Sequence, residues 1–380
     1  MDFTFTTEQE EYREKVRQFA LEANLDRNIP ELDRAGDFNK QGWKRCAEFG
    51  VQGGPIPVEW GGQGQDLMTF VSGLEALGLV CRDNGLMFSI CAHVFACELP
   101  ILAYGSDVQK KRWLPDLCTG NKIAAIAIAE EHGASDAFDM RTTAAEKDGG
   151  YVLNGRKSYV TNAPFCDIAL VFARLHEPSN DIVCLVVEKD SQGLRRAEAM
   201  EKMGFRTAPF GDLVFENCLV SAENRLGDSK SGKLVFMSAM EWERGCLLAP
   251  MVGCMQRQVD QCIERAGNRK QAGESLSKHQ AVAHRIADMK VRTEAARLML
   301  YNFVSKKETR RRANIEASMA KLFISEAFVQ NALDAVQIHG AYGYTAESGI
   351  ERELRDAVGT KIASGTSDIQ RNIIAKWLKL

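Results

Sequence analysis

The apolar positions of this chain follow three successive patterns. From Glu8 to about Leu117 they recur at helical spacing, interrupted only by the turn-rich stretch from Pro55 to Gly64. From about Ile123 to Leu226 they form short β-rich runs instead. After Gly232 helical patterns return and continue to the end of the chain. The order of helices, β module and helices predicts an α+β chain.

The middle section is predicted to be a compact all-β module, because turn signals such as Asp148-Gly149-Gly150 and Asn154-Gly155 separate its short apolar runs. The predicted strands are Ile123–Ala129, Tyr151–Asn154, Ile168–Ala173, Ile182–Val187 and Leu213–Phe215. The predicted helices beyond them are Leu234–Ala266, Lys278–Ser305, Asn314–His339 and Ser367–Leu380. No long polar linker separates these parts, so we expect them to pack against one another.

Composition and charge narrow the class of protein. A chain of 380 residues with 45% hydrophobic and 26% charged residues can bury a sizeable core, and we expect two or three domains. Its net charge of −3 gives no broad positive surface, so nucleic acid is not expected as a partner. The 11 cysteines lack paired spacing, which favours free thiols in a reducing compartment, with the cytoplasm as the default. The acidic amino terminus and the lack of a long uninterrupted apolar run predict neither a targeting nor a membrane segment.

Several familiar catalytic motifs are missing from the sequence. There is no GxGxxG after a predicted strand, no GxxxxGK[ST], no HExxH and no GxSxG. The nicotinamide-binding, P-loop, zincin and serine-hydrolase classes therefore lose their best sequence support. Any dinucleotide must bind in another way.

Two clusters of polar residues have plain structural explanations. Cys91-Ala92-His93 with Cys97 is the nearest approach to a metal site, but it lies in an apolar helical run and lacks a second ligand pair, so we expect a packed helix and no metal. Lys306-Lys307 and Arg310-Arg311-Arg312 form a basic run between two predicted helices. This run is either a solvated loop or a patch for a phosphate or an acidic carrier protein.

Glu243 stands out on the predicted helix Leu234–Ala266. At 100° per residue it lies in the middle of an apolar stripe, whereas Glu241 points elsewhere. The stripe consists of Phe236, Met240, Leu247, Met251 and Cys254. A carboxylate on an apolar face is costly unless it is paired, and burial raises its pKa toward the range of a general base. The alternative is an ion pair with Arg244 or with another helix.

A second cluster lies in the β module. The segment Ala129 to Asp136 is rich in small and polar residues, which would let backbone N–H groups approach a ligand. Tyr159 and Thr161 would project from the same face of a strand, one offering a ring and the other a hydroxyl. The alternative is that the loop is polar only because it turns.

A third cluster lies near the carboxyl end, between Ile362 and Gln370. Gly365 permits a tight turn, and Thr366 or Ser367 can cap the last helix, whose N-terminus then faces an anion. A capped helix without a ligand remains the alternative.

Taken in order, these segments resemble the acyl-CoA dehydrogenase family over essentially the whole chain. Ala129 to Asp136 resembles the family's Thr-Glu-Pro-x-Ala-Gly-Ser-Asp, Tyr159 to Asn162 resembles Trp-Ile-Thr-Asn, and Arg269 to Gly273 resembles Arg-x-x-Phe-Gly. The matching segments also include Gln337 to Ala341, Gly365 to Gln370 and the turn from Pro57 to Gly64.

The resemblance implies a fold and a cofactor. The fold is an N-terminal helical domain (residues 1–121), a middle β domain of barrel or sandwich type (122–230) and a C-terminal four-helix bundle (231–380), usually assembled as a homotetramer. FAD would lie between the β domain and the bundle. The residues that would contact it within one subunit are Ile126, Ile128, Ala129, Ala134, Ser135, Tyr159, Val160, Thr161, Thr366 and Asp368.

Some of these roles are specific. By the resemblance, Tyr159 would stack on the isoalloxazine and Thr161 would hydrogen-bond near N5. Four residues would instead reach the FAD of a neighbouring subunit, namely Arg269, Gln337, Gly340 and Ala341. Arg244, Ser364 and Gly365 would lie at the substrate.

The base departs from the family's commonest pattern. Many members carry a Glu immediately before the Gly-Thr of the last motif, and this chain has Ser364 there. A minority branch, which includes isovaleryl and long-chain enzymes, carries the Glu on the bundle helix, in a Leu-Glu-Arg context that resembles Trp242-Glu243-Arg244. The resemblance and the helical periodicity agree on Glu243 as the catalytic base.

The expected reaction is α,β-dehydrogenation of a thioester, in which Glu243 takes the α-proton and the β-hydride passes to the flavin. The segments Met240 to Ala249 and Ser364 to Leu380 resemble the branch that oxidises aminoacyl groups, including prolyl groups, on carrier proteins in natural-product biosynthesis. Alternatives are an acyl-CoA dehydrogenase for a short or branched acyl group and a non-catalytic flavin- or carrier-binding protein. The electron acceptor, whether an electron-transferring flavoprotein or oxygen, stays open.

Overall fold

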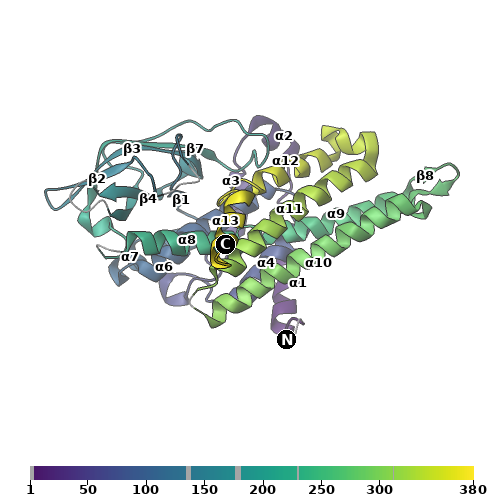
Figure 1. The fold of residues 1–380 in the computed structure, drawn as a ribbon, viewed down its shortest axis with the longest axis horizontal. Helices are drawn as coiled ribbons and strands as arrows, with labels where there is room; N and C mark the ends of the chain where they lie inside the picture. The colour runs from purple at the N-terminus through teal and green to yellow at the C-terminus, as the bar shows by residue number, and fades with distance from the viewer. Residues whose placement is uncertain (1–3, 134–137, 176–180, 229–230, 311) are drawn as a thin grey trace.

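The computed structural model describes residues 4–133, 138–175, 181–228, 231–310 and 312–380. It contains a helical N-terminal part, a curled β-sheet and a bundle of long helices that extends away from the sheet (Figure 1). The α+β order predicted from the sequence is therefore confirmed. Ala134 and Ser135, which the resemblance predicts to contact FAD, lie outside the described residues.

The N-terminal part is helical because its apolar positions are periodic and its helices begin at capping residues. Thr6 and Ser106 each close a capping box with a glutamine three residues later, while Asp66 and Asp83 cap two buried helices. The helices are α1 (Thr7–Glu22), α2 (Ile29–Ala35), α3 (Lys40–Phe49), α4 (Leu67–Val80), α5 (Asn84–His93), α6 (Leu99–Tyr104) and α7 (Asp107–Cys118). The turn near Pro57 contains the short 3-10 helix η1 (Val58–Trp60).

A continuous helical stretch runs from Asn84 to Tyr104, because the π-helical segment η2 (Val94–Glu98) joins α5 to α6. By length and composition alone this stretch is long enough to cross a membrane, but 89% of its most apolar window is buried inside the protein. Its apolar character is accounted for by its place in the core.

The sheet has seven strands in the order β1-β4-β2-β3-β7-β6, with β5 pairing on β4. The strands are β1 (Ala124–Ala127), β2 (Thr143–Lys147), β3 (Gly150–Thr161), β4 (Ile168–Leu175), β5 (Ile182–Glu188), β6 (Leu194–Arg196) and β7 (Phe210–Ser221). Strand β4 pairs in parallel with β1 and β2, and the other pairs are antiparallel. One face of the sheet packs on its own curled interior, and the other packs on the helices.

The sequence prediction of this sheet needs two corrections. Strands β2 and β6 were not predicted, and Asn154-Gly155 is not a turn between strands. Those two residues lie inside β3, where the register to β7 shifts between Leu153 and Gly155. Gly155 takes a φ of +141° there, which only glycine adopts without strain, so its turn-like composition marks a bulge.

The C-terminal part consists of six helices: α8 (Gly232–Cys246), α9 (Ala249–Asn268), α10 (Gln280–Thr309), α11 (Asn314–His339), α12 (Ile350–Thr360) and α13 (Ser367–Trp377). A small hairpin of β8 (Lys270–Gln271) and β9 (Glu274–Ser275) joins α9 to α10 at the far end of the bundle (Figure 1). Short 3-10 helices complete the described elements, namely η3 (Ala163–Phe165), η4 (Ala222–Asn224), η5 (Leu276–Lys278), η6 (Gly340–Tyr344) and η7 (Ala346–Ser348).

The prediction of a single helix over Leu234–Ala266 is wrong. It is divided into α8 and α9 at Leu247-Leu248, and Pro250 lies in the first turn of α9, where its missing N–H costs nothing. The predicted apolar stripe, which includes Met251 and Cys254, therefore spans two helices. Glu243 still lies on α8, three residues before that helix ends.

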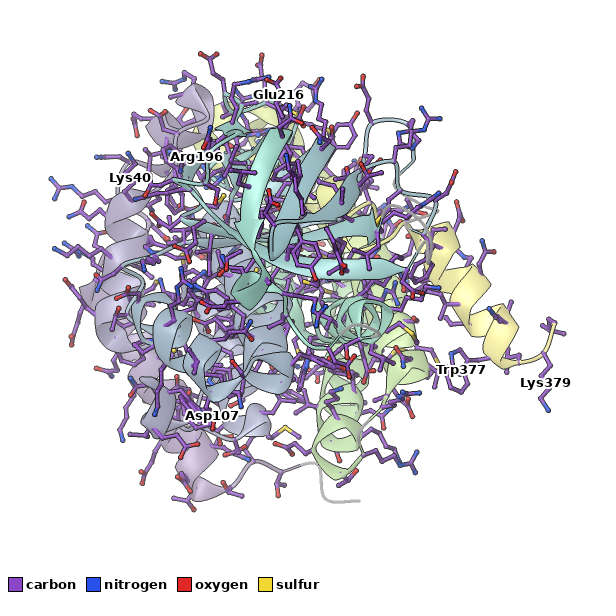
Figure 2. The ribbon with its side chains drawn as sticks, turned by 90° about the vertical axis from the view of Figure 1, so that its left-hand side faces the viewer. Lys40, Asp107, Arg196, Glu216, Trp377 and Lys379 are labelled. Atoms are coloured by element: carbon purple, nitrogen blue, oxygen red, sulfur yellow. The ribbon has the colours of Figure 1, made fainter. Side chains whose placement is uncertain are left out.

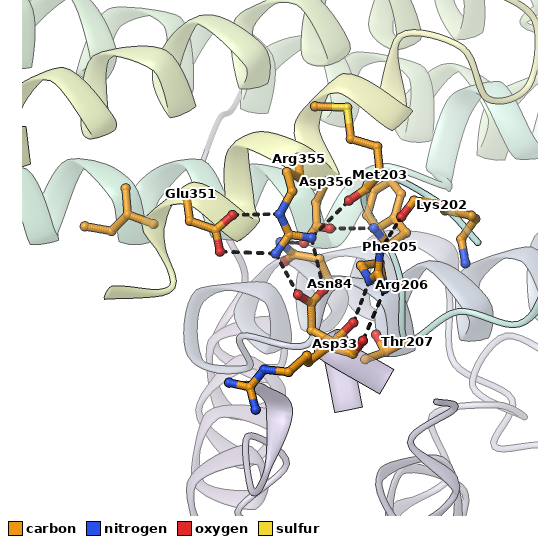
Figure 3. Close-up of polar contacts among 12 residues, drawn as sticks. Asp33, Asn84, Lys202, Met203, Phe205, Arg206, Thr207, Glu351, Arg355 and Asp356 are labelled. Carbon is orange, nitrogen blue, oxygen red and sulfur yellow. Dashed lines mark hydrogen bonds and ion pairs between the residues drawn. The ribbon is translucent and has the colours of Figure 1, made fainter. Parts of the chain in front are cut away.

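The three sequence segments interlock at a polar junction (Figure 3). Arg355 on α12 pairs with Asp33 of α2 at 2.6 Å and donates to the carbonyl of Met203, which follows β6. The neighbouring Asp356 accepts from the N–H of Phe205 at 2.5 Å and from Asn84 Nδ2 at 3.0 Å. Each of these bonds joins different parts of the chain, so the junction fixes the bundle relative to the sheet.

Candidate functional site

Two glutamates on α8 have opposite surroundings. Glu241 is only 3% exposed, and its carboxylate accepts hydrogen bonds from Lys307 Nζ at 2.7 Å and from the N–H of Ala313 at 2.8 Å. Glu243 is half-buried, and no cation among the described residues forms an ion pair with it within 4.0 Å. Glu241 thus takes the structural ion pair that was the alternative for Glu243. Glu243 therefore differs from Glu241 in lacking a close cation, although it is the less buried of the two.

The surroundings of Glu243 suit a proton acceptor. Burial raises its pKa to about 7, while the Arg244 guanidinium, the Ser364 hydroxyl and the Lys321 ammonium limit that rise. A carboxyl with this pKa is ionised and protonated in similar amounts near neutral pH, which favours general-base catalysis. Burial and the charge of the nearby Glu243 together raise the pKa of the Cys97 thiol in η2.

The turn before α13 faces this carboxyl. Ser364 and Gly365 have φ values of +56° and +90°, and Thr366 ends the turn by capping α13 through a 3.3 Å bond from the N–H of Ile369. The Ser364 hydroxyl lies near enough to lower the pKa of Glu243, yet it forms no hydrogen bond of ordinary geometry within the described part of the chain. A buried hydroxyl left without a partner beside the base is a group that a substrate can satisfy.

Side chains from three helices hold this turn in place. Arg244 Nε on α8 donates to the carbonyl of Ser364 at 3.4 Å, and Gln370 Nε2 on α13 donates to the carbonyls of Ser364 and Gly365 at 3.2 and 2.9 Å. Lys321 Nζ on α11 donates to the carbonyl of Lys361 at 3.1 Å. A turn with two consecutive left-handed residues persists only when its surroundings hold it, and these bonds do so.

Sequence reasoning missed Lys321 and Gln370. Lys321 is a lone charge inside the apolar run Ala317–Ile324, which is the same signal that singled out Glu243. Gln370 gave no signal, because glutamine is unremarkable in the first turns of a helix.

In the β domain, the end of β1 lies next to the bulged part of β3. The N–H of Ser158 donates to the carbonyl of Ala129 at 2.8 Å, and Lys157 Nζ donates to the carbonyl of Ile128 at 2.9 Å. The predicted contacts Ile126, Ile128 and Ala129 are therefore beside the Tyr159 segment, and all three stay partly exposed.

A buried ion pair fastens this arrangement. Glu130 bonds Lys157 Nζ at 2.7 Å and accepts from the N–H groups of Arg141 and Thr142 at 2.7 and 3.0 Å. Burial opposes the ionisation of Glu130, but the hydrogen bond and charge of Lys157 outweigh it and lower its pKa to about 2. This pair holds the loop after β1 and has no free group for chemistry.

Tyr159 is presented to its surroundings by a strained backbone. Its φ is +60°, at a second register shift of β3 between Lys157 and Val160, and its side chain is 49% exposed. Its ring lies 6.2 Å from that of Phe210 at an interplanar angle of 29°. Thr161 is partly exposed, as is Tyr159, whereas Val160 between them is buried in the sheet interior. Only the backbone of Val160 remains available to a ligand.

Two of the predicted cofactor contacts lie at the start of α13. Thr366 is partly exposed and uses its hydroxyl as the N-cap, so a ligand would share that oxygen with the helix. Asp368 is exposed in the first turn and pairs with Arg371 at 3.0 Å.

The four residues expected to serve a neighbouring subunit lie far from this region. Arg269, Gln337, Gly340 and Ala341 are all exposed. They gather near the distal ends of α9 and α11, at the end of the bundle opposite the sheet (Figure 1). The two helix ends are tied by Arg265, which donates to the carbonyl of His339 at 3.5 Å. Within one chain these residues are not brought to Tyr159 or Glu243.

The cysteine and histidine cluster is a packed core segment, as expected. His93 is buried, its Nδ1 accepts from the N–H of Ala124 at 2.9 Å, and its Nε2 lies 3.1 Å from Glu98. Across the described residues no group of three or more potential ligands could hold a metal ion.

Comparison with known proteins covers the chain almost from end to end. The model described as the acyl-CoA dehydrogenase N-terminal domain matches residues 6–121, that of the middle domain matches 125–218, and that of the C-terminal domain matches 230–379. This chain belongs to the acyl-CoA dehydrogenase family. The resemblance read from the motifs is confirmed, and so is the family's fold.

Individual relatives in the family match over full length. An L-prolyl-[peptidyl-carrier protein] dehydrogenase of Pseudomonas fluorescens is 38% identical, with all of both chains covered. An acyl-CoA dehydrogenase of Bacillus subtilis is 34% identical over 98% of each chain. Among solved structures, the prolyl acyl carrier protein oxidase AnaB is 45% identical with a TM-score of 0.97, covering 99% of this chain and all of that one. The FAD complex of PigA is 36% identical with a TM-score of 0.96 and full coverage of both chains.

Proposed function

We propose that this chain is an FAD-dependent dehydrogenase that removes the α and β hydrogens of a prolyl thioester carried on a carrier protein, with Glu243 as the base. The observation that carries the proposal is a half-buried carboxylate without a close cation, with a pKa of about 7, beside a turn that is held by three helices. The relatives that act on carrier-bound prolyl groups support the choice of substrate.

The residues near the sheet fit a flavin. Tyr159 offers a half-exposed ring held outward by a positive φ, and Ile128 and Ala129 leave a partly exposed strand end beside it. The Ser158 hydroxyl is buried and has no partner among the described side and main chains, so it is available to a polar ligand. A flavin held by these residues would supply the acceptor for the substrate's β-hydride.

The chain's own residues carry the proton chemistry. Glu243 takes the α-proton, and the backbone of the turn at Ser364 holds the thioester carbonyl, where negative charge develops as the proton leaves. Arg244 and Lys321 add positive charge behind this turn. A site that excludes water strengthens both effects, because charges interact more strongly at low dielectric.

The four residues at the distal end of the bundle would act across subunits in an assembly of several chains. We propose a homotetramer or dimer of dimers in which Arg269, Gln337, Gly340 and Ala341 of one subunit contact the FAD of another. Their exposure at the far end of the bundle supports this arrangement. The projecting end of α13 adds an apolar surface for assembly, since Trp377 is 58% exposed and stands clear of the molecule with Lys379 (Figure 2).

The domain limits, the cellular location and the electron acceptor also belong to the proposal. We propose residues 1–121, 122–230 and 231–380 as the three domains, the cytoplasm as the location, and an electron-transferring flavoprotein or oxygen as the electron acceptor. Roles for Ile126, Thr161, Thr366 and Asp368 at the cofactor, and for Gly365 at the substrate, belong to the same proposal.

One assay tests the reaction and the handle together. Purified protein is mixed without oxygen with prolyl thioesters of a carrier protein and of CoA, and loss of the visible flavin band is followed. The proposal expects faster bleaching with the carrier-bound substrate. Faster bleaching with CoA would favour an acyl-CoA dehydrogenase, in line with the Bacillus subtilis relative. Yellow protein that no thioester bleaches would favour a non-catalytic flavin-binding protein.

A further inference from the structure

Lys321 is a charged side chain in a place that does not readily accept one. It is 1% exposed, although ammonium groups are rarely buried without a carboxylate partner. Its Nζ donates to the carbonyl of Lys361 at 3.1 Å, and no carboxylate among the described residues lies within 4.0 Å of it. By contrast, the buried Lys157 and Lys307 each pair directly with a glutamate at 2.7 Å.

The carbonyl that Lys321 contacts begins the turn at the active site. Lys361 directly follows α12, and its carbonyl also accepts the N–H of Ser367 at 3.0 Å, which closes the loop that contains Ser364 and Gly365. A tether at this atom therefore fixes where the turn starts, while Gln370 fixes where it ends.

The charge of Lys321 also reaches the base. Of the groups around Glu243, Arg244 on α8 and Lys321 on α11 lower the pKa of the carboxyl through their charge, and the nearby Ser364 hydroxyl lowers it as well. The Cys97 thiol of η2 is neutral at physiological pH, because its own pKa is raised well above the ordinary value.

The environment of Lys321 itself contains charges of both signs. Burial lowers its pKa to about 8, Glu326 on the same helix and Glu243 oppose this, and Arg244 and Lys361 reinforce it. Glu326 is in turn occupied by Lys361 at 2.9 Å and by Arg371 of α13 at 3.7 Å. The carboxylate nearest in sequence is thus shared with two other cations.

We propose that Lys321 is a positioning residue for the dehydrogenation, which holds the turn that receives the thioester through Lys361 and supplies the buried positive charge that keeps Glu243 ionised. This inference rests on the proposed function of Glu243. It assigns to α11 a part in the reaction that the sequence motifs do not mark.

The two parts of the proposal can be separated by substitution. Lys321→Gln keeps a donor for the Lys361 carbonyl and removes the charge, Lys321→Met removes both, and Lys321→Arg keeps the charge. Lys290→Met is the control, because it deletes a half-exposed ammonium from α10 that pairs with Glu294 of the same helix.

The expected results follow from the sign of the charge. Without the cation the pKa of Glu243 rises. A rise of about one unit lowers the ionised fraction at pH 7 from about one half to about one tenth, so flavin reduction there slows by about fivefold and recovers as the pH is raised. Both Lys321→Gln and Lys321→Met show this shift, and Lys321→Met additionally weakens substrate binding because the turn is released. Lys321→Arg keeps the wild-type profile, and Lys290→Met does not change it.

A second measurement does not depend on turnover. The carboxyl of Glu243 is titrated by infrared difference spectroscopy in the FAD-loaded protein, with Glu243→Gln as the blank. A higher midpoint in Lys321→Gln supports the proposal, and an unchanged midpoint together with an unchanged rate profile overturns it. If none of the thioesters reduces the flavin of the wild-type protein, the proposed reaction fails. The titration still decides the role of Lys321.

Discussion

The Nε atom of Arg244 lies 3.4 Å from the carbonyl oxygen of Ser364, and this contact joins α8, which carries the proposed base, to the turn before α13. Glu243 and Ser364 are thus neighbours in space although 120 residues separate Arg244 from Ser364 in sequence. The site depends on the docking of α13 and its preceding turn against α8. We expect catalysis to be sensitive to both sides of this contact.

Glu243→Gln should remove the base without removing the fold. General-base catalysis typically contributes about 10²- to 10⁴-fold, and we expect a loss of that order in the rate of flavin reduction. The measurement is anaerobic stopped-flow bleaching with a prolyl-carrier thioester, at equal FAD content. Retained turnover would show that another residue is the base.

Glu241→Gln is the matched control on the same helix. It breaks a buried ion pair with Lys307, so we expect a loss of roughly 3 kcal/mol in the free energy of unfolding, measured by urea denaturation. The folded fraction should keep its rate of flavin reduction. An inactive but fully stable Glu241→Gln protein would contradict the division of roles between the two glutamates.

The pH dependence should reflect the pKa of about 7 of Glu243. A base is active when ionised, so flavin reduction at saturating substrate should rise with pH through about 7 and then level off. A rate that stays constant from pH 5 to pH 9 would be inconsistent with this carboxyl as the base.

The same raised pKa affects stability with a definite sign. Between its ordinary value of 4.5 and about 7 the folded protein binds the proton more tightly than the unfolded chain, so stability from this group is lost as the pH rises through about 7. Glu243→Gln, which stays neutral, should therefore be more stable than wild type at pH 8, by on the order of 1–3 kcal/mol, and similar to it near pH 4. Thermal unfolding at both pH values measures this difference.

The junction around Arg355 should be a stability determinant far from the base. Arg355→Met leaves Asp33 and the Met203 carbonyl without their shared donor, and we expect a cost of about 2–3 kcal/mol in urea denaturation. Arg371→Met, which removes more exposed ion pairs with Asp368 and Glu326, should cost less than about 1 kcal/mol. Equal effects of the two variants would argue against the junction.

The basic run at the end of α10 offers a test of the carrier protein. Arg310 and Arg312 are exposed, and the adjoining Ala313 and Lys307 contact Glu241 on α8, two residues from the base. If an acidic carrier docks there, Arg310→Glu with Arg312→Glu should raise KM for the carrier-bound thioester by roughly tenfold at low salt and leave the CoA thioester unaffected. Equal changes for both substrates would place the docking surface elsewhere.

Arg269→Ala tests whether one subunit completes the cofactor site of another. Arg269 lies at the distal end of the bundle, so its loss should not disturb Glu243 within the same chain. We expect the purified variant to hold less FAD per subunit than wild type at equal protein concentration, measured by its visible absorbance. Undiminished FAD content would remove the support for this contact.

The sequence predicted elements best where periodicity was long and the ends were marked. Helix α11 was predicted with the bounds that the structure has, from Asn314 to His339. Strand β2 was missed because Thr143–Lys147 is short and half polar, and it forms by pairing with β3 across the two-residue turn Asp148-Gly149. The break between α8 and α9 was missed because the apolar positions continue across Leu247-Leu248, and only Pro250 marked a new first turn.

The candidate site was predicted in part, for a physical reason. A charge on the apolar face of a predicted helix can be recognised locally, and together with the family resemblance this singled out Glu243. Its pairing state cannot be predicted in the same way, because the partners of Glu241 come from α10 and from Ala313, which precedes α11. The contact of Lys321 with the terminal turn depends on how α11 packs, so its lone charge could be noticed in the sequence but its partner could not be predicted.

The proposed base lies on α8, whereas the backbone proposed to hold the thioester carbonyl lies on the left-handed turn before α13. A change in the size or shape of the turn around Ser364 and Gly365 can then alter which acyl group is accepted, while α8 keeps the proton acceptor where it is. The shape of the acyl site and the position of the proton acceptor are then set by different parts of the chain. An engineer could therefore vary the turn at Ile362 and Ala363 in search of new thioesters and keep Ser364, whose hydroxyl lowers the pKa of Glu243.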